Sequence, residues 1–199
     1  PRDYKGVVAD HTFFDSLHCE HKINIVYAGA LYAARRDPAP LIKTLSKSSG
    51  RNEFAIHFFG PGEHEVQRLL PDVDLHDLCF FHGRLPRSRI LAIQKAASLN
   101  LFLESGDPDA KGVMTGKIFE LIAMGRPILS IGPKHDFEST QVLYNSGLLV
   151  RWEDLKKPAQ DIIRCSSSPT KISDNTLNGF SREWMCEKLW RKMLDLPSN

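Results

Sequence analysis

Six short apolar runs, separated by stretches of helical patterning, constrain the fold of this chain more than any other feature of its sequence. The runs span residues 23–28, 54–59, 78–81, 99–103, 127–131 and 148–150. They are apolar almost without alternation, which is typical of strands buried on both faces of a sheet. Gly29, Gly60 and Gly83 stand at or just beyond the ends of the first three runs, where glycine marks a strand end.

The stretches between these runs carry helix signals. Pro38 and Pro86 stand where a helix can begin, and apolar residues recur behind them at helical spacing. The helices that we expect span residues 38–45, 63–70, 86–97, 115–124 and 137–145. Strands that alternate with helices form a parallel sheet, because each crossover must return over one of its faces. The sequence therefore predicts an α/β fold, a doubly wound parallel six-stranded Rossmann-like sheet with helices on both faces.

Three segments lie outside the predicted sheet domain, which spans residues 23–166. Residues 1–22 lack clear periodicity and are interpreted as a linker or arm. Residues 167–179 begin with Ser167, Ser168 and Pro169 and are predicted to form a loop. Residues 180–196 carry Trp184 and Trp190 in an amphipathic helical pattern. We expect a C-terminal helix there that packs on this domain or on a missing N-terminal domain.

Composition excludes several classes of protein. The 26 Lys and Arg residues against 24 Asp and Glu leave a net charge of +2, which argues against a nucleic-acid module or an electrostatic membrane binder. No run of about 18 apolar residues occurs, so no transmembrane helix is expected. The chain starts at Pro1 without a charged-then-apolar leader. We interpret this abrupt start as a sign that the 199 residues are a piece of a longer protein.

The four cysteines favour neither a disulfide framework nor a zinc knuckle. They are scattered, without a C-x-x-C pair, at Cys19, Cys79, Cys165 and Cys186. A reducing compartment fits this pattern, and Cys79 is predicted to be a small core residue because it lies in an apolar run. His18 and His21 flank Cys19. No downstream residues complete a metal site at zinc-like spacing, so a solvated N-terminal segment is the favoured interpretation.

Ligands of doubly wound sheets bind in the loops after the carboxyl ends of the strands. The first of these loops begins at Gly29, which permits close approach of the backbone to a ligand. Arg35 and Arg36 follow at the mouth of the next helix, and guanidinium groups suit phosphate oxygens. The alternative is a solvated arginine pair, with one member bound to Asp37. The composition of the loop leaves both interpretations open.

The loop that ends near residue 115 is more informative. Gly112 and Gly116 permit a tight turn, and Thr115 or a neighbour begins a helix whose positive end faces the binding edge. Lys117 lies in the first turn of this helix, where a cation is unfavourable unless an anion is present, which indicates a phosphate. Glu120 lies one turn later and could accept paired hydroxyl donors, as from a ribose. The alternative is a surface ion pair between Lys117 and Glu120.

Three common motifs are absent from these loops. Three residues, not four, separate Gly112 from Gly116, and Ile118 stands where a P-loop carries Ser or Thr. The glycines after residue 59 open a dinucleotide fingerprint, but Glu65 stands at the third-glycine position. No G-x-S-x-G sequence occurs, which weighs against a serine hydrolase.

Several segments resemble the signature sequences of one enzyme family. Residues 117–129, KIFELIAMGRPIL, resemble the K-x-F-E-Y-x-A-x-G-x-P-I-L signature of group-1 glycosyltransferases of the GT-B fold. Residues 27–38 resemble the G-x-L-Y…R-R-x-P opening of that family, residues 81–86 its F-x-G-x-V-P segment, and residues 180–183 its closing helix. The resemblance implies the C-terminal, donor-binding half of a two-domain enzyme similar to family 4, and thus one half of a GT-B fold.

The resemblance also implies roles for individual residues. The donor diphosphate is expected to bind Gly29, Arg35 or Arg36, Thr115, Gly116 and Lys117. The ribose is expected at Glu120, the base at Gly83, Arg84 and Leu85, and the donor sugar at Asp109, Gly112, Val113 and Met114. Gly112 stands where many members carry a glutamate, and Ala30 where many carry an arginine. The catalytic residues are unassigned and are expected mostly in the missing domain.

The resemblance implies a hexosyltransferase-like enzyme of polysaccharide biosynthesis. It would transfer a sugar from a UDP-, GDP-, ADP- or dTDP-sugar to a glycan or a lipid-linked acceptor, with no metal or other cofactor. We expect a cytoplasmic enzyme whose contact with the inner face of the membrane, if any, is made by the missing half. This chain alone is expected to have little activity. Two alternatives are half of a GT-B-type nucleotide-sugar epimerase and a non-catalytic nucleotide-binding or interaction module.

Overall fold

A computed structural model describes residues 4, 6–32, 35–105, 107, 109, 115–132 and 136–167. Its elements along the chain are α2 (Thr12–Asp15), β1 (Ile23–Ala28), α3 (Ala39–Ser46), η1 (Arg51–Glu53), β2 (Phe54–Phe59), α4 (Glu63–Leu69), β3 (Cys79–Phe81), α5 (Arg87–Ala96), β4 (Leu99–Leu103), α6 (Gly116–Met124), β5 (Ile128–Ile131), α7 (Glu138–Asn145), β6 (Leu149–Arg151), η3 (Trp152–Asp154) and α8 (Pro158–Ser167). Every strand and helix that was expected up to residue 150 is present, near its expected position.

The six strands form one sheet in the order β3-β2-β1-β4-β5-β6, and every neighbouring pair is parallel. This arrangement confirms the predicted Rossmann-like architecture. β1 pairs with β2 from Ile23 against Phe54 to Ala28 against Phe59, and it pairs with β4 on its other side. The direction in which strands are added reverses between β1 and β4. Open α/β sheets bind their ligands at the carboxyl ends of the strands that flank such a reversal.

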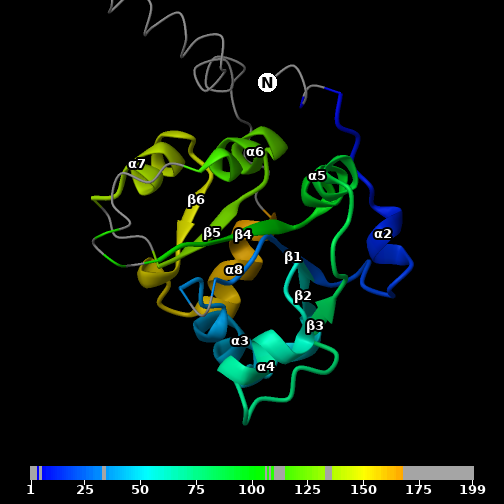
Figure 1. Cartoon of the computed structure of the whole chain (residues 1–199). Coiled ribbons are helices and arrows are strands. Elements are labelled where there is room, and N and C mark those ends of the chain that lie inside the picture. The colour runs from blue at the N-terminus through cyan, green and yellow to red at the C-terminus, as the bar shows by residue number, and fades with distance from the viewer. Residues whose placement is uncertain are drawn as a thin grey trace, which may run out of the picture.

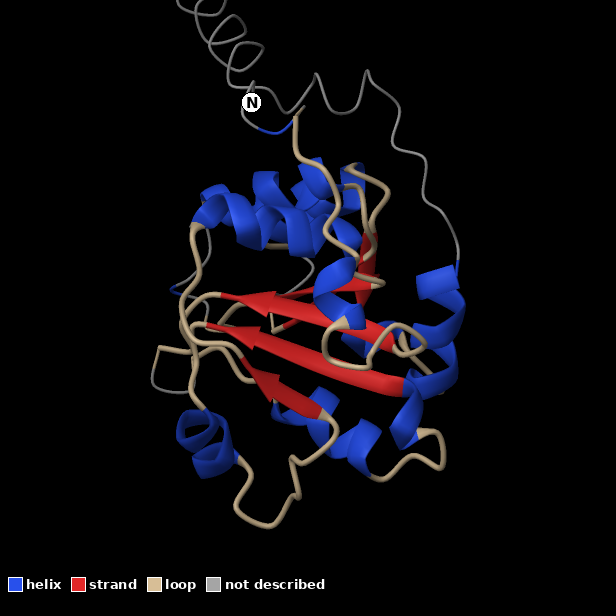
Figure 2. Cartoon of the chain, turned by 90° about the vertical axis from the view of Figure 1, so that its right-hand side faces the viewer, coloured by secondary structure: helices blue, strands red, loops and turns tan. Residues whose placement is uncertain are grey.

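Helices cover both faces of this sheet (Figure 1 and Figure 2). One face carries α3, α4 and α8, and the other carries α5, α6 and α7 (Figure 1). Successive side chains of β1 enter different layers, because Ile25 and Tyr27 belong to the core that includes α3 and α4, whereas Val26 packs with α5. Burial on both faces explains why the strand sequences are apolar without alternation.

Residues 6–22, which fall within the expected linker or arm, pack against the sheet domain. Phe14 of α2 and Cys19 are 3% and 1% exposed and share a core with residues of β1, β2 and α5. The backbone N–H of Asp10 also donates to the carbonyl oxygen of Ala92 in α5 at 3.1 Å. A solvated segment around Cys19 was expected, and this expectation is wrong. The segment supplies part of the apolar cover on the α5 face of the sheet.

α8 is a helix that the sequence patterning did not predict. Its Ile162 is 1% exposed and packs in the core on the α3 face. Ser167, expected at the start of a loop, is the last residue of this helix. The rest of the predicted 167–179 loop and the predicted 180–196 helix lie outside the described residues. Among the helices of the described ranges, none combines the length and apolarity needed to cross a membrane.

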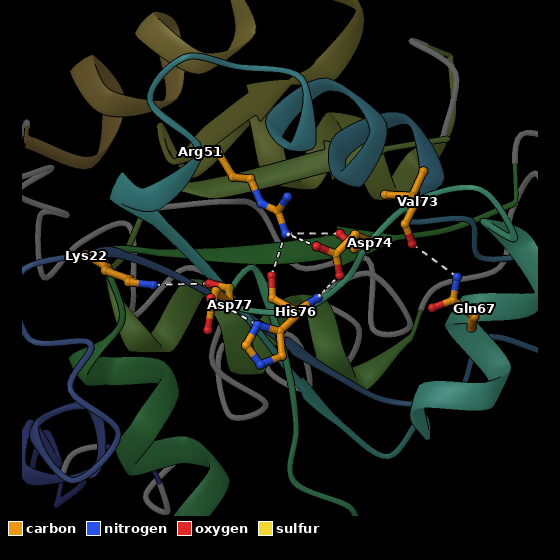
Figure 3. A network of polar contacts seen from close by, with 7 residues as sticks. All are labelled: Lys22, Arg51, Gln67, Val73, Asp74, His76 and Asp77. Carbon is orange, nitrogen blue, oxygen red and sulfur yellow. Dashed lines mark hydrogen bonds and ion pairs between the residues drawn. The ribbon is translucent and has the colours of Figure 1, made fainter.

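A network of polar contacts anchors the loop between α4 and β3 at the amino edge of the sheet (Figure 3). Nη2 of Arg51 donates to the carbonyl oxygens of Asp74 and His76 at 3.2 and 2.5 Å. Nζ of Lys22 donates to the carbonyl oxygen of Asp77 at 3.1 Å. Lys22 directly precedes β1, so these contacts lie at the opposite end of the strands from the expected ligand site.

Candidate functional site

Glycines follow three of the strands directly at the carboxyl edge of the sheet. Gly29, Gly60 and Gly132 come after β1, β2 and β5 and have φ angles of 147°, 118° and 107°. Other residues rarely adopt such angles. A Cβ at Gly60 would lie 2.6 Å from the carbonyl oxygen of Gly29, and a Cβ at Gly132 would collide with the carbonyl oxygen of Glu104. The backbones of adjacent loops therefore lie too close together for side chains at these positions.

Lys117 reaches from the first turn of α6 to the end of β1. Its Nζ donates to the carbonyl oxygen of Ala28 and lies 5.3 Å from the centre of the Tyr27 ring, in a cation–π contact. A Cβ at Gly29 would overlap this Nζ, so the end of the Lys117 side chain would have to shift if another residue stood there. The structure thus brings Lys117 and Gly29, both predicted to hold the diphosphate, into contact at the β1/β4 reversal.

Arg36 is the arginine of the β1 loop that reaches the same place. Its Nε and Nη2 donate to Oε1 of Glu104 at 3.2 Å, and Nη2 also reaches Oε2 at 3.3 Å. Both side chains are largely buried, at 15% and 13% exposure. Arg35 is exposed. The expected alternative, an arginine bound to Asp37, is not what the described contacts show, because Oδ1 of Asp37 accepts from the N–H of Ala39 at the start of α3.

The surroundings of Lys117 disfavour its charged form. Burial, reinforced by the nearby Arg36 guanidinium, lowers the pKa of Lys117 to about 8, although the Glu104 and Glu120 carboxylates act in the opposite direction. Burial also raises the pKa of Tyr27 to about 12, so its hydroxyl is neutral and donates to the carbonyl oxygen of Ala30 at 2.8 Å. Glu104 is paired with Arg36, and among the described residues no carboxylate forms an ion pair with Lys117. A bound anion would therefore stabilise the charged form of Lys117.

The side-chain hydroxyl of Thr115, two residues before Lys117, makes no hydrogen bond among the described residues. Thr115 is the N-cap residue of α6, yet its side chain makes no capping hydrogen bond. Its Oγ1 atom is buried and has no hydrogen-bond partner among the described residues. Gly116 is exposed, and a Cβ there would meet nothing within 4 Å. A buried hydroxyl without a partner is costly, and a ligand oxygen at the positive end of α6 would satisfy it.

Glu120, the predicted ribose ligand, lies one turn along α6 from Lys117. Its Oε1 accepts from Nε of Arg87 at 2.9 Å, and Nη2 of Arg87 lies 2.8 Å from the same oxygen. The expected alternative, an ion pair between Lys117 and Glu120, is not formed, because Lys117 is drawn to the carbonyl group of Ala28 instead. Glu120 nevertheless remains partly exposed, at 27% of its side chain, and is accessible to a ligand.

The residues predicted to meet the base follow β3 at the same edge of the sheet. Gly83 has a φ angle of 63°, and its carbonyl oxygen accepts from the N–H of Gly60 at 2.7 Å. Arg84 is exposed, and Leu85 is half-buried against the core that contains Phe14. This turn after β3 is therefore bound to the loop after β2, and β3 lies two strands away from β1 in the sheet.

The predicted donor-sugar residues are only partly described. Gly112, Val113 and Met114 lie outside the described residues. Asp109 is exposed, and its backbone N–H donates to Oδ1 of Asp107 at 3.1 Å. Within the described ranges, no group of three or more His, Cys, Asp and Glu side chains is placed to hold a metal ion.

Two residues of this site were not identified from the sequence. Glu104 follows β4 directly, so its position in the sequence already indicated that it lies at the carboxyl edge of the sheet. That its carboxylate is buried against Arg36 could not be predicted from the sequence. Arg87 opens α5, and no local pattern indicates that it reaches Glu120 on α6. The combined arrangement offers two cations and a helix N-terminus for phosphate oxygens and a nearby carboxylate for hydroxyl groups.

Comparison with solved structures identifies the fold. HepE from Anabaena, solved with UDP-glucose, is similar with a TM-score of 0.64 and 14% identity, over 98% of this chain and 53% of that chain. Sucrose-phosphate synthase from Thermosynechococcus elongatus is similar with a TM-score of 0.63 and 16% identity, over 96% of this chain and 51% of that chain. UDP-GlcNAc 2-epimerase from Methanocaldococcus jannaschii is similar with a TM-score of 0.54 and 14% identity, over 94% of this chain and 48% of that chain.

These likenesses show the fold, which is one Rossmann-like half of the GT-B architecture, as expected. This chain spans about half the length of each of the three solved chains. No protein-family model and no curated protein matches the sequence.

Proposed function

We propose that the carboxyl edge at the β1/β4 reversal binds a nucleotide sugar, and that this chain is the donor-binding domain of a glycosyltransferase. The observation that carries the proposal is the Lys117 ammonium group, which forms no ion pair with a carboxylate among the described residues, while the nearby Arg36 is paired with Glu104. The Oγ1 atom of Thr115, two residues before Lys117, is likewise buried without a hydrogen-bond partner among the described residues. A diphosphate would supply the missing negative charge and accept from Thr115 Oγ1. Glu120 lies one turn further along α6, where it would accept hydrogen bonds from the ribose.

The similar solved structures support this assignment of ligand. HepE was solved with UDP-glucose, and separately with UDP and with UDP and glucose. In the proposed reaction, Lys117, Arg36 and the N-terminus of α6 stabilise the charge that develops on the departing nucleoside diphosphate. These groups would act there without a metal ion. The sugar would pass to a glycan or a lipid-linked acceptor held by a second domain, so this chain alone is proposed to bind the donor and to transfer little.

Calorimetric titration of the chain with UDP, GDP, ADP and dTDP tests the binding proposal. Saturable binding of at least one of these nucleotides is expected. Inorganic pyrophosphate should compete with the bound nucleotide, because the proposed contacts are made chiefly to the diphosphate. If none of the four nucleotides binds saturably, the proposal is wrong.

The Lys117→Ala variant tests the role of the ammonium group. We expect the affinity for the best-bound nucleoside diphosphate to fall about 10- to 100-fold, as when a hydrogen bond to a charged group is lost. Binding of the bare nucleoside should change by less than about twofold, because the nucleoside carries no phosphate to meet this cation. The exposed lysine Lys43 of α3 gives a matched control, and Lys43→Ala should leave both affinities unchanged. Equal losses for both ligands would refute a contact to phosphate.

A nucleotide-sugar epimerase is the second candidate, and it is favoured by one observation, the likeness to UDP-GlcNAc 2-epimerase. An epimerase would alter the sugar without an acceptor, so the full-length gene product should convert UDP-GlcNAc on its own. Following the sugar protons by NMR in the absence of acceptor separates the two functions. Epimerised sugar would favour the second candidate, and donor consumption that requires an added acceptor would favour the transferase.

A further inference from the structure

Arg87 holds one oxygen of the Glu120 carboxylate and leaves the other unused. Both Nε and Nη2 of Arg87 lie within 2.9 Å of Oε1. Among the described residues, no hydrogen bond or ion pair reaches Oε2. A carboxylate held at one oxygen has a fixed orientation, and its second oxygen remains available to accept a hydrogen bond. This geometry fits a carboxylate positioned to bind a hydroxyl group.

The location of Arg87 makes its bond to Glu120 electrostatically favourable. Arg87 is the first residue of α5, where the positive end of the helix dipole disfavours a cation. The Glu120 carboxylate offsets this cost, because it forms an ion pair with the Arg87 guanidinium. The ion pair also links α5 to α6, the helix that carries Lys117.

The N-terminal segment holds Arg87 from the other side. The hydroxyl of Tyr4 accepts from Nη2 of Arg87 at 2.9 Å, and the guanidinium lies 5.4 Å from the centre of the Tyr4 ring. The Arg87 side chain is 55% exposed and borders a hollow of about 530 Å³ between residues 6–8 and α5. Its position therefore depends on these polar contacts more than on packing.

We propose that Arg87, held by Tyr4, is a positioning residue that fixes the Glu120 carboxylate for the ribose hydroxyls of the bound nucleotide. This inference rests on the proposed function, in which Glu120 receives the ribose. It makes the N-terminal segment part of the nucleotide site, although that segment precedes the first strand. An arginine that merely competed with the ribose for Glu120 would have the opposite effect on affinity.

Two nucleotides separate positioning from a general structural role. UDP carries both ribose hydroxyls, and 2′,3′-dideoxyuridine 5′-diphosphate carries neither. Calorimetric titration of the Arg87→Gln variant should show UDP binding weakened about 5- to 10-fold, the effect of one poorly placed hydrogen bond. The affinity for the dideoxy compound should change by less than about twofold. The preference for UDP over the dideoxy compound therefore falls.

The exposed residue Arg89 of α5 supplies a matched control. Arg89→Gln removes the same charge two residues away and should leave both affinities unchanged. Arg87→Lys should restore part of the preference for UDP, because an ammonium can hold one carboxylate oxygen. In a Glu120→Ala background, Arg87→Gln should have no further effect on UDP binding. Melting curves monitored by circular dichroism verify that each variant is folded.

The outcomes distinguish this inference from the proposed function. If the wild-type chain binds UDP but Arg87→Gln binds it equally well or more tightly, the positioning role alone is overturned. Equal weakening of UDP and the dideoxy compound would also overturn it, since the effect would then not pass through the ribose. If the wild-type chain binds none of UDP, GDP, ADP and dTDP, the proposed function itself fails.

Discussion

Lys117 places a positive charge in the first turn of α6, where the helix dipole disfavours it. The structure offsets this cost with the carbonyl group of Ala28 and the ring of Tyr27, and burial still lowers the pKa of Lys117 to about 8. A neighbouring diphosphate would favour the charged ammonium and raise that pKa again. At the scale of single residues, the candidate site is therefore built around a largely buried cation whose contacts are a carbonyl group and an aromatic ring.

This pKa predicts that binding of UDP is coupled to proton uptake. Above pH 8 a growing fraction of the free protein carries neutral Lys117, which must be protonated on binding, so the affinity should fall by up to about tenfold per pH unit. Titrations at pH 8.5 in two buffers of different ionisation enthalpy measure the proton uptake directly. The Lys117→Arg variant stays charged and should show no uptake. Equal uptake in this variant would assign the proton to another group.

His57 is a buried polar residue at the centre of β2. It is fully buried, its Nε2 lies 2.9 Å from Oδ1 of Asn24, and its Nδ1 lies 3.1 Å from Nε2 of His82. Burial, with a smaller contribution from the charge of His82, lowers the pKa of His57 to about 3, and burial also lowers the pKa of His82. Both rings are therefore neutral in the folded protein at neutral pH.

A stability profile follows from the low pKa of His57. In the unfolded chain His57 is protonated below pH 6.5, whereas in the folded chain it stays neutral down to about pH 3. Its contribution to the free energy of unfolding is therefore fully present above pH 6.5 and is lost as the pH falls below that value. From this group we expect the free energy of unfolding to be lower by about 2 kcal/mol at pH 5 than at pH 8. Urea unfolding at several pH values between 5 and 8 measures this difference in the free energy of unfolding. His57→Gln should flatten the profile, whereas His21→Gln, at a side chain that is 94% exposed, should not.

At the scale of elements, the segment before β1 differs most from what the sequence predicted, which was a linker or arm outside the core. α2 has only four residues, too few to be stable alone. It is held because Phe14 is buried among residues of β1, β2 and α5, and because the backbone at Asp10 bonds to α5. The segment is thus part of the core, and Tyr4, near its start, also contacts Arg87.

The Phe14→Ala variant tests this assignment. Removing a ring that is 3% exposed should lower the free energy of unfolding by about 3–5 kcal/mol, through lost burial and the cavity that remains. Val8 lies in the same segment and is 79% exposed, so Val8→Ala should change it by less than about 0.5 kcal/mol. Urea denaturation compares the two variants. A loss for Phe14→Ala as small as that for Val8→Ala would show that the segment is a detached arm.

At the scale of the whole molecule, the two ends of the parallel strands serve different purposes. The amino edge is anchored by Arg51 and Lys22, which tie down the loop between α4 and β3 (Figure 3). The carboxyl edge gathers the glycine turns, the two cations and Glu120 at the point where the strand order reverses. A ligand at that edge would connect the β1–β2–β3 half of the sheet to the β4–β5–β6 half.

This division predicts where a nucleotide changes the dynamics of the chain. Saturating UDP should slow backbone hydrogen exchange at residues 29–32 and 115–120, because the ligand would bind N–H groups and restrain both loops. Residues 71–78 at the amino edge provide an internal reference and should be unaffected. Hydrogen exchange followed by mass spectrometry resolves these segments. Protection centred on residues 71–78 would place the nucleotide at the wrong edge of the sheet.

The strands, the helices between them and the edge at which a ligand would bind could all be predicted from the amino-acid sequence. These follow from local patterns, because a buried parallel strand needs a continuous apolar run and a helix start needs particular residues within a few positions. The contact between Lys117 and the glycine after β1 was also within reach, because both lie at carboxyl ends of strands in one sheet.

The partner of each charged side chain, in contrast, became known from the folded structure alone. Arg36 pairs with Glu104, which lies 68 residues away, and Glu120 pairs with Arg87, which lies 33 residues away. The nearby candidates, Asp37 and Lys117, are engaged by backbone groups instead. Such choices depend on which loops the folded sheet brings together and on how far each group is buried. Neither quantity is encoded in the local spacing of residues, and for the same reason the packing of Phe14 and the reach of Arg87 could not be predicted.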